Sequence, residues 1–186
     1  MVVMKSANEL DQRLDLIKDF VNTLDFEAGA DSIGTPEELA TWLADNELVD
    51  DVVEPSAEEA DRAVRVREAI RELLALHNEI DADGAAAAAT LDEVARSSHL
   101  GLRFRDGRTA LEPEGDGASA ALGRLVATVA ELMQTDQWPR LKTCRDETCR
   151  YVFYDHSRNR SRAWCSMEVC GNREKARSFR ERHAHS

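Results

Sequence analysis

The sequence predicts a mainly α-helical α+β protein built from two units. Residues 1–138 are predicted to form a helical domain that contains a β-hairpin, and residues 139–186 a small unit with a β-hairpin and a helix. Three observations support this prediction. Apolar residues recur with helical spacing over most of the first unit. The spacing changes to strict alternation near residue 102. All four cysteines lie in the second unit.

Two helix starts carry strong capping signals. Thr35 precedes Pro36, and Glu38 follows three residues after Thr35, which is the pattern of a capping box with proline at the first helical position. Ser56 and Glu59 repeat this spacing. We therefore expect one helix that begins after Thr35 and a longer amphipathic helix from Ser56 to about Glu79.

The other helices are predicted from periodicity alone. Apolar residues from Leu10 to Leu24 share one helical face, although a strand break within residues 19–23 is an alternative. A shorter helix is expected over residues 84–99, and another from about Ser119 until Pro139 interrupts it.

One segment of the first unit reads as a hairpin. Leu102 and Phe104 alternate with Arg103 and Arg105, which is typical of a strand with one apolar face. The pair at 106–107 is Asp-Gly, a sequence that favours a tight turn between two strands.

The charge is distributed unevenly along the chain. The formal net charge is -12, but the segment from Arg140 onward contains 12 Lys and Arg against 6 Asp and Glu. The remaining residues therefore contain 12 basic against 30 acidic side chains. An acidic domain thus precedes a basic unit that suits a polyanionic partner.

Several protein classes lack support in the sequence. No apolar run approaches the roughly 20 residues of a membrane span, and the first residues lack the apolar core of a signal peptide. We therefore expect a cytoplasmic protein with no membrane partner. Phosphate-binding, dinucleotide-binding and zinc-protease motifs are also missing, so an enzyme is not predicted.

The cysteines form two C-x4-C pairs separated by fifteen residues, Cys144 with Cys149 and Cys165 with Cys170. In a reducing compartment such pairs favour a metal site over disulfides. Four thiolates close the coordination shell of Zn²⁺, whereas catalytic zinc keeps an open position. We therefore predict one structural zinc ion per chain; catalytic or redox chemistry is the alternative.

The residues around the cysteines suggest secondary structure as well. Residues 151–154 alternate as in a strand, a polar turn follows over 155–159, and a basic helix is expected after Asn172. A helical wheel places Phe179 beside a row of arginines, so we expect Phe179 to pack against the metal site while the arginines face outward.

These motifs resemble a known family. The segment from about Leu141 to Arg182, with the run FYDHSRNRSRAWCSMEVCGNR, is similar to the CGNR zinc finger, named for the residues that stand here at 170–173. One departure is Ala163, where the family pattern has a second basic residue before the tryptophan. The segments LIKDFVNTLDF and GTPEELATWLADNELV resemble the ABATE domain that precedes this finger. The resemblance implies a stress-induced transcription regulator that binds DNA.

Candidate contacts to nucleic acid are six of the ten arginines of the basic unit: Arg158, Arg160, Arg162, Arg173, Arg177 and Arg180. Some of them are alternatively expected to donate hydrogen bonds to the zinc thiolates, Arg173 first among them. A finger that docks a protein instead of DNA is a second hypothesis. RNA binding through stacking on Tyr151, Phe153 and Tyr154 is a third.

The N-terminal domain offers one candidate ligand site. Asp19, Asn22 and Thr23 are predicted to line a pocket for a small-molecule effector, which would make this domain a sensor. The alternative is that these polar residues are caps and turns at a helix end. A homodimer is expected by analogy with regulators that bind twofold DNA sites.

Overall fold

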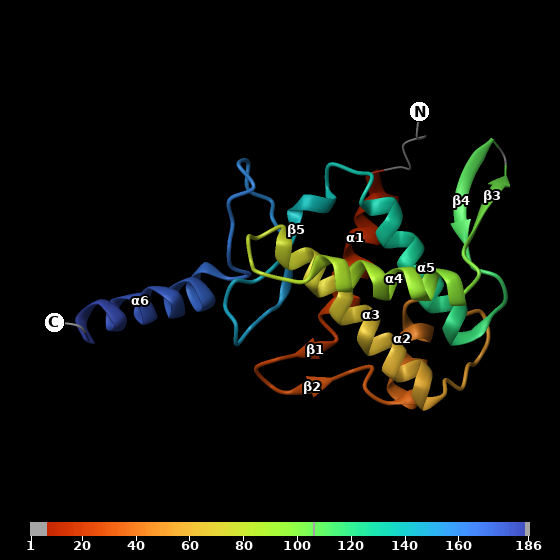
Figure 1. Cartoon of the computed structure of the whole chain (residues 1–186), viewed down its shortest axis with the longest axis horizontal. Helices are drawn as coiled ribbons and strands as arrows, with labels where there is room; N and C mark the ends of the chain where they lie inside the picture. The colour runs from red at the N-terminus through yellow and green to blue at the C-terminus, as the bar shows by residue number, and fades with distance from the viewer. Residues whose placement is uncertain (1–6, 106, 185–186) are drawn as a thin grey trace.

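The computed structural model describes residues 7–105 and 107–184. Five α-helices form the body: α1 (Ala7–Val21), α2 (Pro36–Asp45), α3 (Ala57–Leu76), α4 (Gly84–Ser97) and α5 (Gly117–Leu132). Helix α3 packs against α1, α2, α4 and α5. The mainly helical α+β class predicted from the sequence is confirmed (Figure 1).

Both predicted capping boxes are present. The Thr35 hydroxyl accepts from the backbone N–H of Glu38, whose carboxylate accepts from the Thr35 N–H in return. Ser56 and Glu59 make the same reciprocal pair at the start of α3. Each box satisfies donors that a helix start leaves without partners, which explains why these two starts were predicted to the residue.

Two antiparallel hairpins interrupt the helices. Strands β3 (Gly101–Arg105) and β4 (Arg108–Glu112) form the predicted hairpin, with Leu102 opposite Leu111. Gly107 has a φ of +73°, as the turn requires, whereas Asp106 lies outside the described residues. The short pair β1 (Leu24–Asp25) and β2 (Ala30–Asp31) was not predicted: α1 ends at Val21, and Leu24 begins a strand instead of extending the helix.

The C-terminal unit is joined to the helical body. A short 3₁₀ turn, η1 (Trp138–Arg140), leads into β5 (Leu141–Thr143), which pairs with β6 (Val152–Tyr154). Trp138, Leu141 and Val152 are buried in the same apolar cluster as the helices. The small hairpin of the second unit is therefore part of the main core.

Two fully buried arginines on α3 bind distant segments. Arg67 donates to Asp31 at 2.6 Å and to the Thr23 hydroxyl at 3.3 Å. Arg71 donates to the carbonyl oxygens of Val21, at 2.6 Å, and Arg150, at 2.9 Å. The helix thus anchors the end of α1, the β1–β2 hairpin and the C-terminal unit at once.

The far end of α3 makes further contacts with the same unit. Asn78 donates to the carbonyls of Thr143 and Ala163, both at 2.8 Å, and Nδ1 of His77 lies 2.8 Å from the Leu141 carbonyl. These bonds satisfy buried backbone groups that strand pairing leaves open. Within the described residues, the structure contains no helix that is long and apolar enough to cross a membrane.

Replacing Arg71 with alanine should lower the free energy of unfolding by about 3–5 kcal/mol, because two carbonyl groups lose their donor and the partly exposed Glu68 loses one of its two arginine partners. Urea denaturation measures the change. The exposed Arg96, whose nearest carboxylate oxygen is 4.0 Å away on Asp92, provides the control: Arg96→Ala should stay within about 0.5 kcal/mol of the wild type. Equal losses in both variants would contradict the anchoring role.

Candidate metal centre and the basic elements around it

The four cysteines of the C-terminal unit converge on one point. All four Sγ atoms lie within 4.8 Å of one another. Cys149 Sγ is 3.5 Å from Cys165 Sγ, which is 3.7 Å from Cys170 Sγ. A disulfide requires about 2.05 Å, whereas tetrahedral Zn–S bonds of about 2.3 Å place sulfur atoms about 3.8 Å apart. The cysteines are therefore arranged as the ligands of one structural zinc ion.

The first cysteine pair is held by a turn centred on Asp146. Its Oδ1 accepts from both the N–H and the hydroxyl of Thr148, and its carbonyl accepts from the N–H groups of Cys149 and Arg150. Arg150 adopts a φ of +48°, which reverses the chain toward β6. These hydrogen bonds bring Cys149 back toward Cys144, and none of them depends on a bound metal ion.

The second cysteine pair, Cys165 and Cys170, is positioned by a helical turn. Residues Met167–Gly171 form a π-helical turn, η2, capped by the Ser166 hydroxyl, which accepts from the Val169 N–H at 3.2 Å. Asn172 donates its side-chain amide to the Glu168 carbonyl at 2.9 Å. The asparagine thus satisfies a carbonyl inside the wide turn, where the widened backbone leaves it available.

The chemistry of the cluster fits a closed metal site. Burial raises the pKa of Cys170 to about 12, and hydrogen bonds with Cys144 and Cys149 raise the pKa of Cys165. A metal must therefore displace protons to bind, and its binding energy contributes to folding. Four thiolates complete the tetrahedral shell and leave no open coordination position, so the site is a structural zinc site.

Arg173 does not occupy the inner position that we expected. Its guanidinium forms an ion pair with both carboxylate oxygens of Glu27, in the turn of the β1–β2 hairpin, and lies 3.6 Å from Asp146 Oδ2. Arg162 instead bonds the backbone beside a cysteine: it donates to the carbonyls of Trp164 and Cys165, and its guanidinium carbon lies 5.1 Å from the centroid of the Phe153 ring.

The β1–β2 hairpin holds both halves of the cysteine cluster. The Phe26 ring lies 4.9 Å from the guanidinium carbon of Arg71 and 5.4 Å from that of Arg150, which directly follows Cys149. The next residue, Glu27, pairs with Arg173, three residues after Cys170. Consecutive residues of one hairpin therefore contact the arginine that follows each cysteine pair.

A rigid basic loop leaves β6 on the other side of the site. Asp155 is fully buried, pairs with Lys142 at 2.9 Å and accepts from the N–H groups of Ser157 and Arg162. Burial alone would raise the pKa of Asp155, but these hydrogen bonds lower it below its usual range. Lys142 also donates to the carbonyl of Arg160 at 2.5 Å. The loop is therefore tied down at its base and middle.

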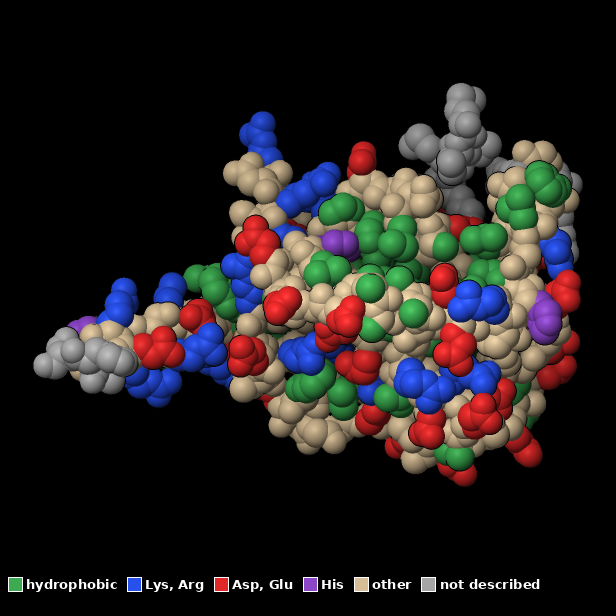
Figure 2. Space-filling model, viewed as in Figure 1, with side chains coloured by type: hydrophobic (Ala, Val, Ile, Leu, Met, Phe, Trp, Pro, Cys, Tyr) green, Lys and Arg blue, Asp and Glu red, His purple; other side chains and the backbone are tan. Residues whose placement is uncertain are grey.

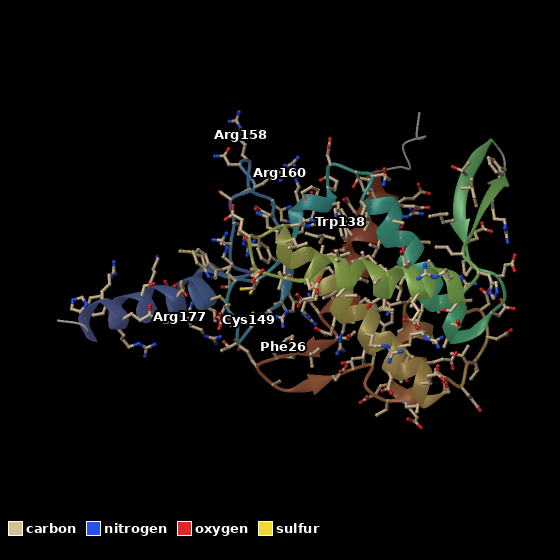
Figure 3. The ribbon with its side chains drawn as sticks, in the orientation of Figure 1. Phe26, Trp138, Cys149, Arg158, Arg160 and Arg177 are labelled. Carbon is tan, nitrogen blue, oxygen red and sulfur yellow. The ribbon has the colours of Figure 1, made fainter. Side chains whose placement is uncertain are left out.

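The six candidate arginines are divided between two elements. Arg158 and Arg160 lie on the loop, which points away from the body, and Arg177 lies on α6 (Asn172–Ala184), which projects in another direction (Figure 3). Within residues 7–105 and 107–184, neither Arg158 nor Arg160 pairs with a carboxylate. Arg177, by contrast, pairs with Glu174.

The predicted packing of Phe179 against the metal site is wrong. Its side chain is 56% exposed and stacks on His183, with ring centroids 4.0 Å apart. Helix α6 contacts the rest of the chain chiefly through η2 and through Arg173, so it extends beyond the reach of the core. Figure 2 shows Lys and Arg side chains along this projecting helix, with some acidic ones among them, and acidic side chains interspersed with basic ones over the visible body.

The candidate ligand residues of the N-terminal domain have protein partners. Asn22 donates to the Val152 carbonyl at 2.8 Å and accepts from the Val152 N–H at 2.7 Å, so it pairs with β6 as a strand would. The Thr23 hydroxyl donates to the Phe20 carbonyl, while the Asp19 carboxylate lies 3.8 Å from Lys18. These contacts give Asn22 and Thr23 structural roles, and effector binding stays a prediction.

Comparison with protein-family models matches both units. Residues 140–183 match the CGNR zinc finger. Residues 14–136 match the ABATE family, described as "Putative stress-induced transcription regulator". No curated protein matches the chain.

Removing zinc with a chelator should expose the amide groups of the two cysteine turns, residues 144–150 and 163–173, to hydrogen exchange and leave β6 and most of α2, α4 and α5 protected. The reason is that the cysteine cluster is separate from the main apolar core. Mass spectrometry of the exchanged protein measures protection by segment, and metal analysis should find about one zinc per untreated chain. Uniform loss of protection, or none, would contradict this separation.

Replacing Asp155 with asparagine should cost about 3–5 kcal/mol of stability, because Lys142 is left charged and buried. Adding Lys142→Met should recover part of that loss, which urea denaturation of the two variants measures. Since the folded-state pKa of Asp155 is lowered, its contribution is present above about pH 4 and is lost as the pH falls. A double variant less stable than the single one would contradict the pairing.

Proposed function

The chain belongs to the ABATE family and carries a CGNR zinc finger, and from this premise we propose that it is a transcription regulator whose finger binds double-stranded DNA. The observation that supports the proposal best is the exposed pair Arg158 and Arg160. Both side chains lie on a loop whose backbone is held by the buried Lys142–Asp155 pair. A preorganised cationic loop loses little conformational entropy when it contacts phosphates.

Helix α6 supplies the second basic element. It projects from the zinc site with Lys175, Arg177 and Arg180 exposed, and an α-helix of this kind fits the major groove of B-DNA. Arg173 stays at the base, where Glu27 holds it, and acts on the orientation of α6. A zinc ion held by the four cysteines would fix the start of α6 through Cys170, while the Lys142–Asp155 pair holds the loop.

The acidic body affects how the finger meets DNA. Its charge repels phosphate groups at long range, so a duplex approaches from the side of the loop and α6. Because the finger is joined to α1, α3 and the residues after α3 by buried and partly buried hydrogen bonds, the body follows the finger onto DNA as a fixed attachment. An effector of the helical domain and a homodimer on twofold sites are compatible extensions of this proposal.

A protein-docking finger is the second candidate function. Met167, Val169 and Phe179 are each about half exposed on η2 and α6, which suits an apolar partner surface. RNA stacking has less support, because Phe153 is buried beneath Arg162 and the Tyr154 hydroxyl bonds to Gln137. Of the three aromatic residues, Tyr151 alone is exposed.

Binding of the zinc-loaded chain to a mixture of labelled genomic duplexes should weaken steeply as salt rises. If Arg158 contacts a phosphate, Arg158→Ala should make the slope of log K against log salt shallower by about one. Arg160→Ala should do the same. Fluorescence anisotropy measures each slope.

The control for these variants is Arg96→Ala, since Arg96 is an exposed arginine of α4, outside the finger. It should bind like the wild type. Absence of duplex affinity at low salt in zinc-loaded protein would overturn the DNA-binding proposal and favour protein docking.

A further inference from the structure

The four zinc ligands differ in their exposure to solvent. Cys144 and Cys170 are 1% and 2% exposed, whereas Cys149 and Cys165 are partly exposed. An open cleft of about 300 Å³ runs between the β1–β2 hairpin and η2, and both partly exposed cysteines line it. Cys170 also borders the cleft but is buried. A small solute that enters the cleft therefore meets Cys149 and Cys165 first.

The same two cysteines are also close together. Their Sγ atoms are 3.5 Å apart, closer than the 3.7 Å between Cys165 and Cys170. A disulfide needs an approach of about 1.5 Å more. Cys149 ends the first cysteine turn and Cys165 begins the second, so a disulfide between them would join the two turns.

Their chemistry suits an attack on an electrophile. A thiol that binds a metal is deprotonated, so it is held as the nucleophilic thiolate at neutral pH. The cleft walls include the apolar side chains of Leu24 and Val169, and a small neutral oxidant is not repelled there, whereas anions meet Asp25 and Glu27. All four cysteines share this chemistry as metal ligands, and solvent access together with proximity distinguishes Cys149 and Cys165.

We propose that Cys149 and Cys165 form an oxidation site at which a peroxide converts two zinc ligands into a disulfide. One thiolate attacks the peroxide, so an S–O bond forms and the O–O bond breaks, with the leaving oxygen taking a proton to become water. The second thiolate attacks the oxidised sulfur, the S–S bond forms, and the second oxygen leaves as water after protonation. Two thiolates lose two electrons in total, and hydrogen peroxide gains them.

Oxidation opens the metal site. The two cysteines that remain, Cys144 and Cys170, cannot close a four-ligand shell, so zinc affinity falls. The turns that orient Arg150 and Arg173 then lose their common point, and α6 loses its orientation with them. Reduction by a small dithiol regenerates the ligands and allows zinc to bind again.

The zinc-loaded full chain is treated with hydrogen peroxide to test this site. A chromogenic chelator records zinc release, and free thiols are alkylated before non-reducing peptide mapping. The chain has four cysteines, all of them in the cluster, so no other thiol contributes to the signal. The first disulfide should join Cys149 to Cys165 with release of one zinc, and dithiothreitol with added zinc should restore the starting state.

Two variants test access through the cleft. Val169→Phe narrows the cleft and should slow zinc release roughly threefold, because the oxidant reaches the thiolates less easily. Met167→Phe is the matched control: Met167 is also half exposed on η2 but does not line the cleft, and its variant should react like the wild type. Both variants keep all four zinc ligands.

Three results would overturn the proposal. They are a first disulfide within one pair, Cys144 with Cys149 or Cys165 with Cys170; retention of zinc during peroxide treatment; and equal release rates for the Val169 and Met167 variants. Zinc release and disulfide position are measured without DNA, so a failure of DNA binding leaves this inference standing.

Discussion

One buried guanidinium, that of Arg71, connects parts of the chain that are far apart in sequence. It satisfies the carbonyl of Val21 at the end of α1 and that of Arg150 directly after the first cysteine pair. The bond to the Val21 carbonyl is buried and the bond to the Arg150 carbonyl is partly buried. A buried carbonyl without a partner costs about 1–3 kcal/mol. The position of the finger therefore depends on the helical body, and the pairing of Glu68 with both Arg67 and Arg71 holds the guanidinium in place.

This attachment explains how opposite charges coexist in one chain. Acidic side chains outnumber basic ones in the helical body, while basic side chains predominate on the loop after β6 and on α6, which project from that body (Figure 1). Arg173 is the exception, because Glu27 neutralises it at the base of α6. The hydrogen-bonded turns and the buried Lys142–Asp155 pair thus keep the basic elements apart from the acidic body. Among the described residues, direct ion pairs between the body and the finger are limited to a few defined contacts.

Much of the architecture was predictable because it depends on local signals. Capping boxes, the hairpin alternation and the paired cysteines each act over a few residues, so the sequence reveals them. The missed features are long-range. The sequence predicts only that Arg67 and Arg71 lie on an amphipathic helix. Their burial depends on acceptors dozens of residues away, side chains for Arg67 and carbonyls for Arg71. In the sequence, Asn22 is a polar residue at the end of a helix; only the structure shows that its side chain bonds the backbone of Val152. The prediction for Phe179 was wrong in the opposite direction: we expected a buried side chain, and it is exposed. A helical wheel cannot show that α6 extends past the core.

The β1–β2 hairpin has a consequence for how this finger can be used or inherited. Zinc fingers that fold alone can be moved between proteins as interchangeable modules, but here Phe26 and Glu27 contact the arginine after each cysteine pair, and Leu141 and Val152 belong to the core of the helical body. A graft of the last 47 residues would carry the metal ligands without the partners that orient them. The two units must therefore evolve together. A substitution in the β1–β2 turn limits which residues are tolerated in the cysteine turns, and a substitution in the cysteine turns limits the β1–β2 turn in the same way.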